Sequence, residues 1–149
     1  MERPTKEQIS ELPLYIGLGL CDIYIVDNEL DAVQAIKEVE NETVIGFDTE
    51  SKPIFQKGQV SPGPSLIQLA TDSKAFLFPT RFPSAVAAAK EILTNPKIKK
   101  IGFGIKGDNK ELRNKLDIDI INTQDLSVTL KQLAGEKNSI GARAAVAMV

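Results

Sequence analysis

The sequence has no histidine and no tryptophan, and it has one cysteine among its 149 residues. Without histidine, a Ser-His-Asp triad, a Cys-His dyad and the common histidine-bearing zinc sites are excluded. Cys21 has no second cysteine with which to form an internal disulfide, which fits a reducing compartment. No apolar run approaches the ~18–20 residues that span a bilayer, and the start lacks a signal-peptide core. We therefore expect a cytoplasmic protein with no membrane partner, whose chemistry uses carboxylates, hydroxyls, lysines or the lone thiol.

The composition is that of one folded domain covering residues 1–149. Hydrophobic residues make up 42% and charged residues 26% of the chain, so a disordered protein is excluded. The net charge of −2 gives no overall positive field. Any nucleic-acid binding must therefore come from a local basic patch.

Apolar runs and helical periodicity predict an α/β fold. We expect short strands at 23–26, 43–47, 66–71, 75–78, 98–103 and 118–121. We expect one helical turn at 6–11 and helices at about 83–93, 108–116 and 126–133, and a further helix that Asp27 or Asn28 caps. The buried stripe of that helix is expected to be Ala32, Val33, Ile36 and Val39. Early strands followed by strand–helix alternation indicate a mixed sheet flanked by helices.

Two segments stand apart from this pattern. Residues 51–64 contain three prolines and two glycines and are expected to form a long loop of functional importance. The last residues form a helix that is apolar on every face, with Ala142, Ala145 and Val146 on one stripe. Such a helix needs cover from another subunit or from a continuation of the chain.

Asp48 and Glu50 are the first candidate site residues. They follow an apolar run typical of a central strand, and residues i and i+2 of a strand point to the same face. Two neighbouring carboxylates repel each other unless a cation neutralises them, and Mg²⁺ or Mn²⁺ prefers such oxygen ligands. The alternative is a solvated turn at the end of the strand.

The segment Gly102–Gly107 has the spacing G-x-G-x-x-G and is followed by Asp108, with Asp125 about 20 residues on. This pattern is typical of a dinucleotide site in which Asp125 would hold the ribose. Asp108 argues against that site, because at the start of a helix it would repel a pyrophosphate. The plain alternative is that Asp108 interacts favourably with the helix dipole.

A basic run surrounds this segment. Residues 97–115 contain seven basic and two acidic side chains, a local charge of +5 in a chain of −2. One interpretation is a solvated helix face. The other is a rim that follows nucleic-acid phosphates beside an acidic metal pocket.

Taken together, these segments resemble the DEDD superfamily of 3′-5′ exonucleases, in its ribonuclease D and Werner-type branch. Within it, the chain is most similar to short stand-alone bacterial exonuclease-domain proteins. The resemblance covers essentially the whole chain. It depends on residues 44–50 (VIGFDTE), 65–70 (SLIQLA), 101–108 (IGFGIKGD), 122–126 (NTQDL) and 140–147 (IGARAAVA).

The resemblance implies a ribonuclease H-like fold with a mixed five-stranded sheet, and hydrolysis at a nucleic-acid 3′ end, in DNA or RNA, by up to two Mg²⁺ or Mn²⁺ ions. Asp48 would bridge both ions, Glu50 would help to hold one of them, and Asp108 would act through the outer shell or a water molecule. Leu66, Phe103 and the 51–64 loop would wedge against the terminal base. The remaining nucleic-acid contacts implied are Thr49, Lys106, Lys110 and Arg113.

The chain departs from the family in its third motif, Tyr-x-x-x-Asp or His-x-x-x-x-Asp, which supplies a fourth carboxylate. The only tyrosines are Tyr15 and Tyr24, and no acid follows Glu136. The C-terminal helical part that carries this motif is therefore expected to be missing. Three interpretations follow from this expectation: a naturally shortened protein, a fragment of a longer enzyme, or a subunit completed by a partner such as a second copy.

We expect weak or undetectable exonuclease activity from these 149 residues. The alternative is a non-catalytic module that binds nucleic-acid ends or associates with itself through its apolar C-terminal helix.

Overall fold

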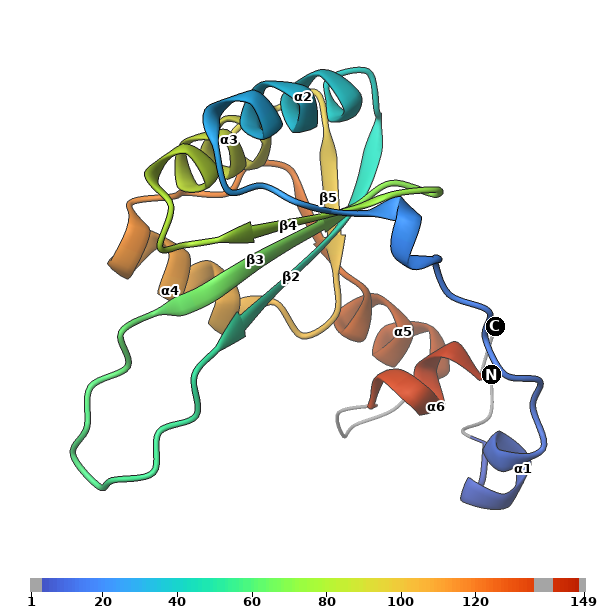
Figure 1. The fold of residues 1–149 in the computed structure, drawn as a ribbon. Helices are drawn as coiled ribbons and strands as arrows, with labels where there is room; N and C mark the ends of the chain where they lie inside the picture. The colour runs from blue at the N-terminus through green and yellow to red at the C-terminus, as the bar shows by residue number, and fades with distance from the viewer. Residues whose placement is uncertain (1–3, 136–140, 148–149) are drawn as a thin grey trace.

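A computed structural model describes residues 4–135 and 141–147 (Figure 1). Six strands form one sheet in the order β1-β4-β3-β2-β5-β6. β3 runs antiparallel to its neighbours β2 and β4, and the other pairs are parallel. The strands are β1 (Ile23–Ile25), β2 (Val44–Ser51), β3 (Pro64–Ala70), β4 (Ala75–Pro79), β5 (Lys99–Gly102) and β6 (Thr123–Asp125). The predicted mixed α/β sheet is confirmed.

The helices interrupt and follow these strands. They are α1 (Lys6–Ser10), the 3-10 turn η1 (Leu20–Asp22), α2 (Glu29–Val39), α3 (Pro83–Leu93), α4 (Lys106–Leu116), α5 (Leu126–Ala134) and α6 (Ala142–Val146). Asn28 begins α2, because its side-chain oxygen accepts a hydrogen bond from the Asp31 amide at 3.0 Å. Pro83 begins α3, where its missing N–H costs no helical hydrogen bond. None of the helices in the described ranges is long and apolar enough to cross a membrane.

Two expectations about the sheet were wrong. The described residues form six strands and not five, and the last strand lies at Thr123–Asp125 instead of 118–121. Ile118 is fully buried, but it lies in the connection after α4 and not in the hydrogen-bonded ladder. Its apolar character therefore reflects burial, whereas the polar edge strand β6 is set by pairing with β5.

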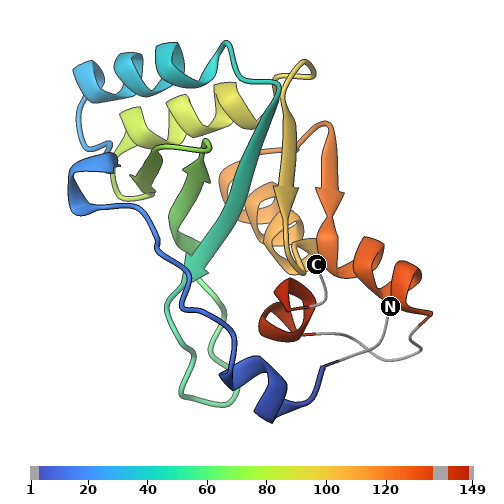
Figure 2. The same ribbon diagram turned by 90° about the vertical axis from the view of Figure 1, so that its right-hand side faces the viewer.

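Three helices cover one face of the sheet. The side chains that point to this face alternate along each strand and are buried, as with Phe47, Leu69 and Phe78. They pack with residues of α2, α3 and α4 in one hydrophobic cluster. Figures 1 and 2 show α2 and α3 side by side, and α4 packs on the same face against β3.

The opposite face of the sheet is open. Its side chains are half-buried or exposed, and part of it forms a shallow pocket between β4, β3, β2 and β5. Asp48 of β2 and Leu126 at the start of α5 are among the residues that line this pocket. The acidic end of β2 thus opens onto the face that the helices leave uncovered.

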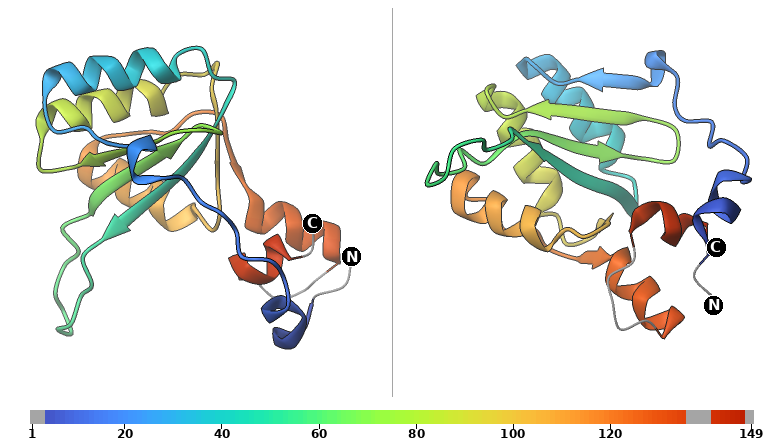
Figure 3. Two further views of the ribbon diagram at one scale, coloured as in Figure 1. Left: turned by 45° about the vertical axis from the view of Figure 1, so that its right-hand side comes forward. Right: turned by 90° about the horizontal axis from the view of Figure 1, so that it is seen from below.

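A second, smaller apolar cluster lies beside the end of β5. Ala144 and Ala145 of α6 are buried there against Ile9 of α1, Phe103 and residues of α5. Figure 3 shows α1, α5 and α6 grouped at this end of the molecule. The terminal helix is therefore covered on one face by its own chain, although Val146 stays 72% exposed. Residues 148 and 149, which the helix was expected to include, lie outside the described residues.

Candidate active site at the end of strand β2

Asp48 and Glu50 share the open face of β2. Their burial alternates with that of the neighbouring strand residues, because Phe47 points into the covered core. The antiparallel register places Asp48 opposite Gln68 and Glu50 opposite Leu66. Leu66 therefore lies on the same face as the two acids, next to Glu50.

The environment of Asp48 favours the protonated form. Burial raises the pKa of its carboxyl, and the nearby charges of Asp108 and Glu50 raise it further. A hydrogen bond that Asp48 accepts from the Thr49 amide at 2.9 Å opposes these effects. Asp108 and Glu50 are therefore near enough to Asp48 to influence the pKa of its carboxyl.

Asp108 lies in the first turn of α4 and is held by Thr49. The Thr49 hydroxyl donates a hydrogen bond to Asp108 Oδ1. Thr49 alternates with Asp48 and Glu50 along the strand, so this contact is made on the helix-covered side of β2. Within the described residues, no three Asp, Glu or Cys side chains are grouped so that they could hold a metal ion. The site is thus a pair of carboxylates, with a third that faces β2 from the other side.

The residues predicted to contact nucleic acid differ in their exposure and in the side chains that they contact. Lys106 and Lys110 are exposed on α4. Arg113 is also exposed, but its guanidinium donates hydrogen bonds to Asp119 through Nε, at 3.1 Å, and Nη2. Phe103 is half-buried in the small cluster with α6. Arg113 is therefore paired with an acid of its own chain and Phe103 lies in a packed cluster, whereas Lys106 and Lys110 are exposed.

The expected long loop connects β2 and β3; it projects away from the sheet, and one arm is attached to α4 (Figures 1 and 2). Ser61 donates a hydrogen bond to Glu111 at 3.2 Å and accepts one from the Gly63 amide at 3.1 Å. Gly63 has φ +95°, and a Cβ there would lie 2.7 Å from Cβ of Lys115. The close approach and the positive φ together require glycine.

Asp125 does not act as a ribose ligand in this structure. Its carboxylate accepts hydrogen bonds from the amides of Gly104, at 2.9 Å, and Ile105, at 3.1 Å. These amides belong to the G-x-G-x-x-G segment, where a dinucleotide pyrophosphate would need free donors. The dinucleotide interpretation is therefore wrong, because a negative side chain of the protein already occupies this turn.

The profile of the 3′-5′ exonuclease family matches residues 23–143, which include every strand of the sheet and all three predicted acids. The chain belongs to this family. A curated relative, the mouse bifunctional 3′-5′ exonuclease/ATP-dependent helicase WRN, is 34% identical over 98 residues. The match covers 63% of this chain and 6% of the mouse protein. The matched part of this chain therefore corresponds to a small part of that relative.

Solved structures support the same fold. The EXO domain of Nibbler from Aedes aegypti superimposes with a TM-score of 0.70 at 18% identity, covering 87% of this chain and 67% of that one. The Trypanosoma brucei RNase D complex with RNA U12 gives a TM-score of 0.61 at 19% identity. It covers 78% of this chain and 48% of that chain. The fold is that of the ribonuclease D and Werner-type exonucleases.

The donor atoms at the end of β2 fit a hard divalent cation. Mg²⁺ is commonly bound by one or two carboxylates, with water and substrate phosphate completing its shell. Asp48 and Glu50 offer two such carboxylates on one exposed face, and the chain has no histidine or second cysteine to favour a softer metal. The pair therefore suits Mg²⁺ or Mn²⁺ better than Zn²⁺.

Proposed function

We propose that this chain binds the 3′ end of single-stranded nucleic acid and hydrolyses its terminal phosphodiester slowly, using Mg²⁺ or Mn²⁺. The observation that carries this proposal is the pair Asp48 and Glu50, side by side on the open face at the end of β2 in a 3′-5′ exonuclease fold. The DEDD exonuclease family depends on divalent metals.

Each residue has a role in this proposal. Asp48 and Glu50 hold the cation, which when bound polarises the phosphodiester and lowers the pKa of water. Asp108 acts through a water molecule, because its own carboxylate is bonded to Thr49. Leu66 packs against the terminal base, and Lys106 and Lys110 lie along the path of the phosphates.

The rate is expected to be low, because the described residues bring only two carboxylates to one face of the strand. A two-metal site needs ligands for both ions, and the loss of a ligand costs stabilisation of the transition state. The second candidate function is binding of a nucleic-acid end without cleavage. The presence of only two carboxylates on the open face of β2 favours it as well.

Metal binding tests the site directly. Isothermal titration of the protein with Mn²⁺ should show binding that Asp48→Asn abolishes. Asp72→Asn is the matched control, because Asp72 lies in the exposed β3–β4 turn away from the site. Equal Mn²⁺ affinity in the native protein and Asp48→Asn would overturn the assignment of the metal site.

Cleavage is tested separately with 5′-labelled single-stranded DNA and RNA in Mn²⁺. The expected result is slow shortening from the 3′ end, lost in Glu50→Gln. Binding of the strand without shortening would leave the end-binding module as the function. Neither binding nor shortening would contradict both.

A further inference from the structure

Asp125 is the most connected carboxylate in the described structure outside the predicted site. Besides the amides of Gly104 and Ile105, it accepts hydrogen bonds from the Ser127 amide at 2.9 Å and the Ser127 hydroxyl at 2.6 Å. Oδ1 receives three of these bonds and Oδ2 receives the one from Ile105. One side chain at the end of β6 therefore joins the start of α5 to the turn that precedes α4.

This turn depends on an acceptor from elsewhere in the chain. Ile105 is the N-cap of α4, and no side chain of the helix itself caps it. Helix N-termini leave backbone N–H groups without partners inside the helix. Gly104 has φ +74°, and its amide and that of Ile105 point to the Asp125 carboxylate. Asp125 thus accepts hydrogen bonds from the N-cap residue and from the residue before it, where no side chain of α4 provides an acceptor.

The hydrogen bonds also fix the charge of this side chain. Burial acts to raise the pKa of the Asp125 carboxyl, but the bonds from Ser127, Gly104 and Ile105 outweigh it, and the pKa lies below its ordinary value. The group is ionised at neutral pH, and an anion is the favoured partner of amides at a helix N-terminus.

The turn leads directly to a predicted site residue. The Asn109 amide bonds to the Ile105 carbonyl at 3.0 Å in the first turn of α4, and Asp108 of the same turn receives the Thr49 hydroxyl. We propose that Asp125 is a positioning residue, whose carboxylate fixes the start of α4 and thereby holds Asp108 against strand β2. The expected effect of Asp125 on metal binding rests on the proposed function, whereas its effect on the start of α4 does not.

Amide hydrogen exchange measures the positioning without reference to metal or activity. In Asp125→Ala the amides of Gly104 and Ile105 should exchange about tenfold faster, the equivalent of one lost hydrogen bond. Ser127→Ala is the matched control, because it removes one donor from Asp125 but leaves both turn contacts in place. Asp125→Asn, which keeps an acceptor but loses the charge, should give an intermediate rate.

The exchange rates of the β3 amides, in the middle of the sheet, report on global unfolding. If these accelerate by the same factor as Gly104 and Ile105, Asp125 stabilises the whole fold and the positioning role is rejected. The role is also rejected if exchange at the turn is unchanged in Asp125→Ala.

Mn²⁺ titration then links the turn to the site. We expect Asp125→Ala to weaken Mn²⁺ binding about tenfold, the lower end of the effect of residues that orient metal ligands, and Ser127→Ala to leave it unchanged. If Asp48→Asn abolishes binding but Asp125→Ala does not alter it, the link from Asp125 to the site is contradicted. If Asp48→Asn has no effect, the proposed metal site fails, and the exchange result still decides the role of Asp125 in the turn.

Discussion

The two faces of the sheet use the same strands for different purposes. On the covered face, Ile45, Leu69 and Phe78 are packed under α2, α3 and α4 with almost no exposure. On the open face, residues of the same strands, such as Asp48 and Leu77, are half-buried or exposed around a shallow pocket. The strand alternation thus separates the residues that stabilise the fold from those available for chemistry.

This separation explains how acidic residues are tolerated at the end of a central strand. A carboxylate on the covered face would be desolvated without a counter-charge, at a cost of several kcal/mol, about the magnitude of a typical domain's margin of stability. On the open face, Asp48 and Glu50 remain within reach of water and of a cation. Substitutions on the two faces should therefore differ both in size and in kind.

The largest contrast is expected between adjacent residues of β4. Phe78 is fully buried, and Phe78→Ala should lower the free energy of unfolding by about 3–5 kcal/mol because it leaves a cavity. Leu77 points to the open face, so Leu77→Ala should cost about 1 kcal/mol. Urea unfolding followed by circular dichroism measures both. Similar losses for the two variants would show that the open face is covered in solution.

Gly102 of β5 and Gly46 of β2 allow a second comparison of the two faces of the sheet. A Cβ at Gly102 would lie 2.2 Å from Ile105 Cγ2 and 2.7 Å from the Phe47 carbonyl oxygen. Gly102→Ala should therefore cost about 1–3 kcal/mol through overpacking. Gly46→Ala is the control on the open face, where the new Cβ would meet Ala70 Cβ at an ordinary 3.6 Å. The same urea experiment should find Gly46→Ala close to the native protein, and an equal loss in both would contradict the steric argument.

The helices of the covered face were predicted well from local signals. The helix Pro83–Leu93 was predicted with its observed bounds, because Pro83 begins it and Asn95-Pro96 stops it. The buried stripe of α2 was predicted less well, since Val33 is 50% exposed and Ala35 is fully buried instead. Alanines allow α2 and α3 to approach each other closely, and this packing preference is not visible in the hydrophobicity of one helix.

The candidate site shows a similar limit. The shared face of Asp48 and Glu50 follows from the period of a strand and was predicted from the sequence. The bond between Thr49 and Asp108 and the capping of the Gly104 turn by Asp125 join residues 59 and 21 positions apart. No local pattern indicates such contacts. The sequence singles out Asp125 by its spacing from the glycine motif, which predicts a ribose contact, and by its position just before a helix, which explains its bond to Ser127 but not those to the turn.

Lys100 is the exception on the covered face, a charged residue with no exposed surface. Its ammonium donates hydrogen bonds to the carbonyls of Asn95, at 2.5 Å, Ile98, at 2.9 Å, and Ile121, at 2.8 Å. Burial lowers the pKa of Lys100 to about 8, from an ordinary 10.5. At a pH between these two pKa values, the unfolded chain therefore keeps the Lys100 proton that the folded protein has largely lost.

The sign of the pH effect follows from this difference. As the pH rises from 7 to 9, the folded protein loses the Lys100 proton while the unfolded chain keeps it, so the free energy of unfolding should increase. Relative to Lys100→Met, which cannot titrate, the native protein should gain about 1 kcal/mol over this range. Urea unfolding at each pH measures the difference, with Lys99→Met as the exposed control. If the difference in the free energy of unfolding between the native protein and Lys100→Met does not change with pH, the hydrogen bonds to the three carbonyls keep Lys100 protonated over this range.

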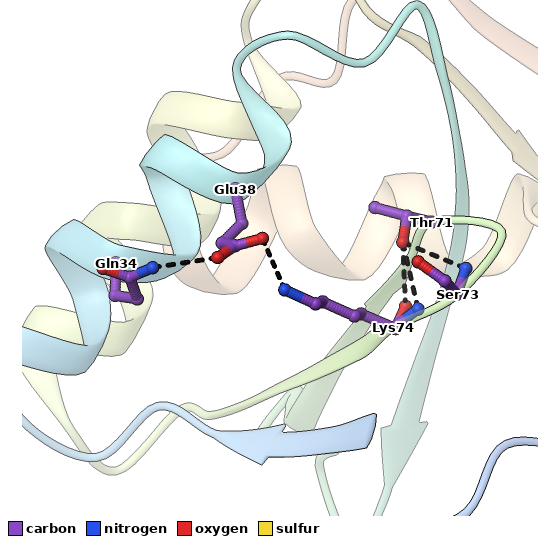
Figure 4. A network of polar contacts seen from close by, with 5 residues as sticks. All are labelled: Gln34, Glu38, Thr71, Ser73 and Lys74. Atoms are coloured by element: carbon purple, nitrogen blue, oxygen red, sulfur yellow. Dashed lines mark hydrogen bonds and ion pairs between the residues drawn. The ribbon is translucent and has the colours of Figure 1, made fainter. Parts of the chain in front are cut away.

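The smallest effect is expected at the margin of the covered face, where Lys74 of the β3–β4 turn contacts Glu38 of α2 at 2.7 Å (Figure 4). Gln34 donates a second hydrogen bond to Glu38 at 2.9 Å, and the Thr71 hydroxyl accepts from the Lys74 amide at 3.0 Å. Each charged side chain keeps 33% of its surface exposed, so water and salt screen the pair. The hydrogen bond from Lys74 lowers the pKa of Glu38, and the bond to Glu38 raises that of Lys74.

The contribution of this pair should therefore be present between the ordinary pKa values of 4.5 and 10.5. It is lost as the pH falls through the lowered pKa of Glu38 or rises through the raised pKa of Lys74. A double-mutant cycle of Glu38→Gln and Lys74→Met, measured by thermal unfolding at pH 7, should give a weak favourable coupling that 1 M NaCl reduces. A coupling as large as the loss in Phe78→Ala, or one insensitive to salt, would mean that this contact is shielded from water and belongs with the covered core.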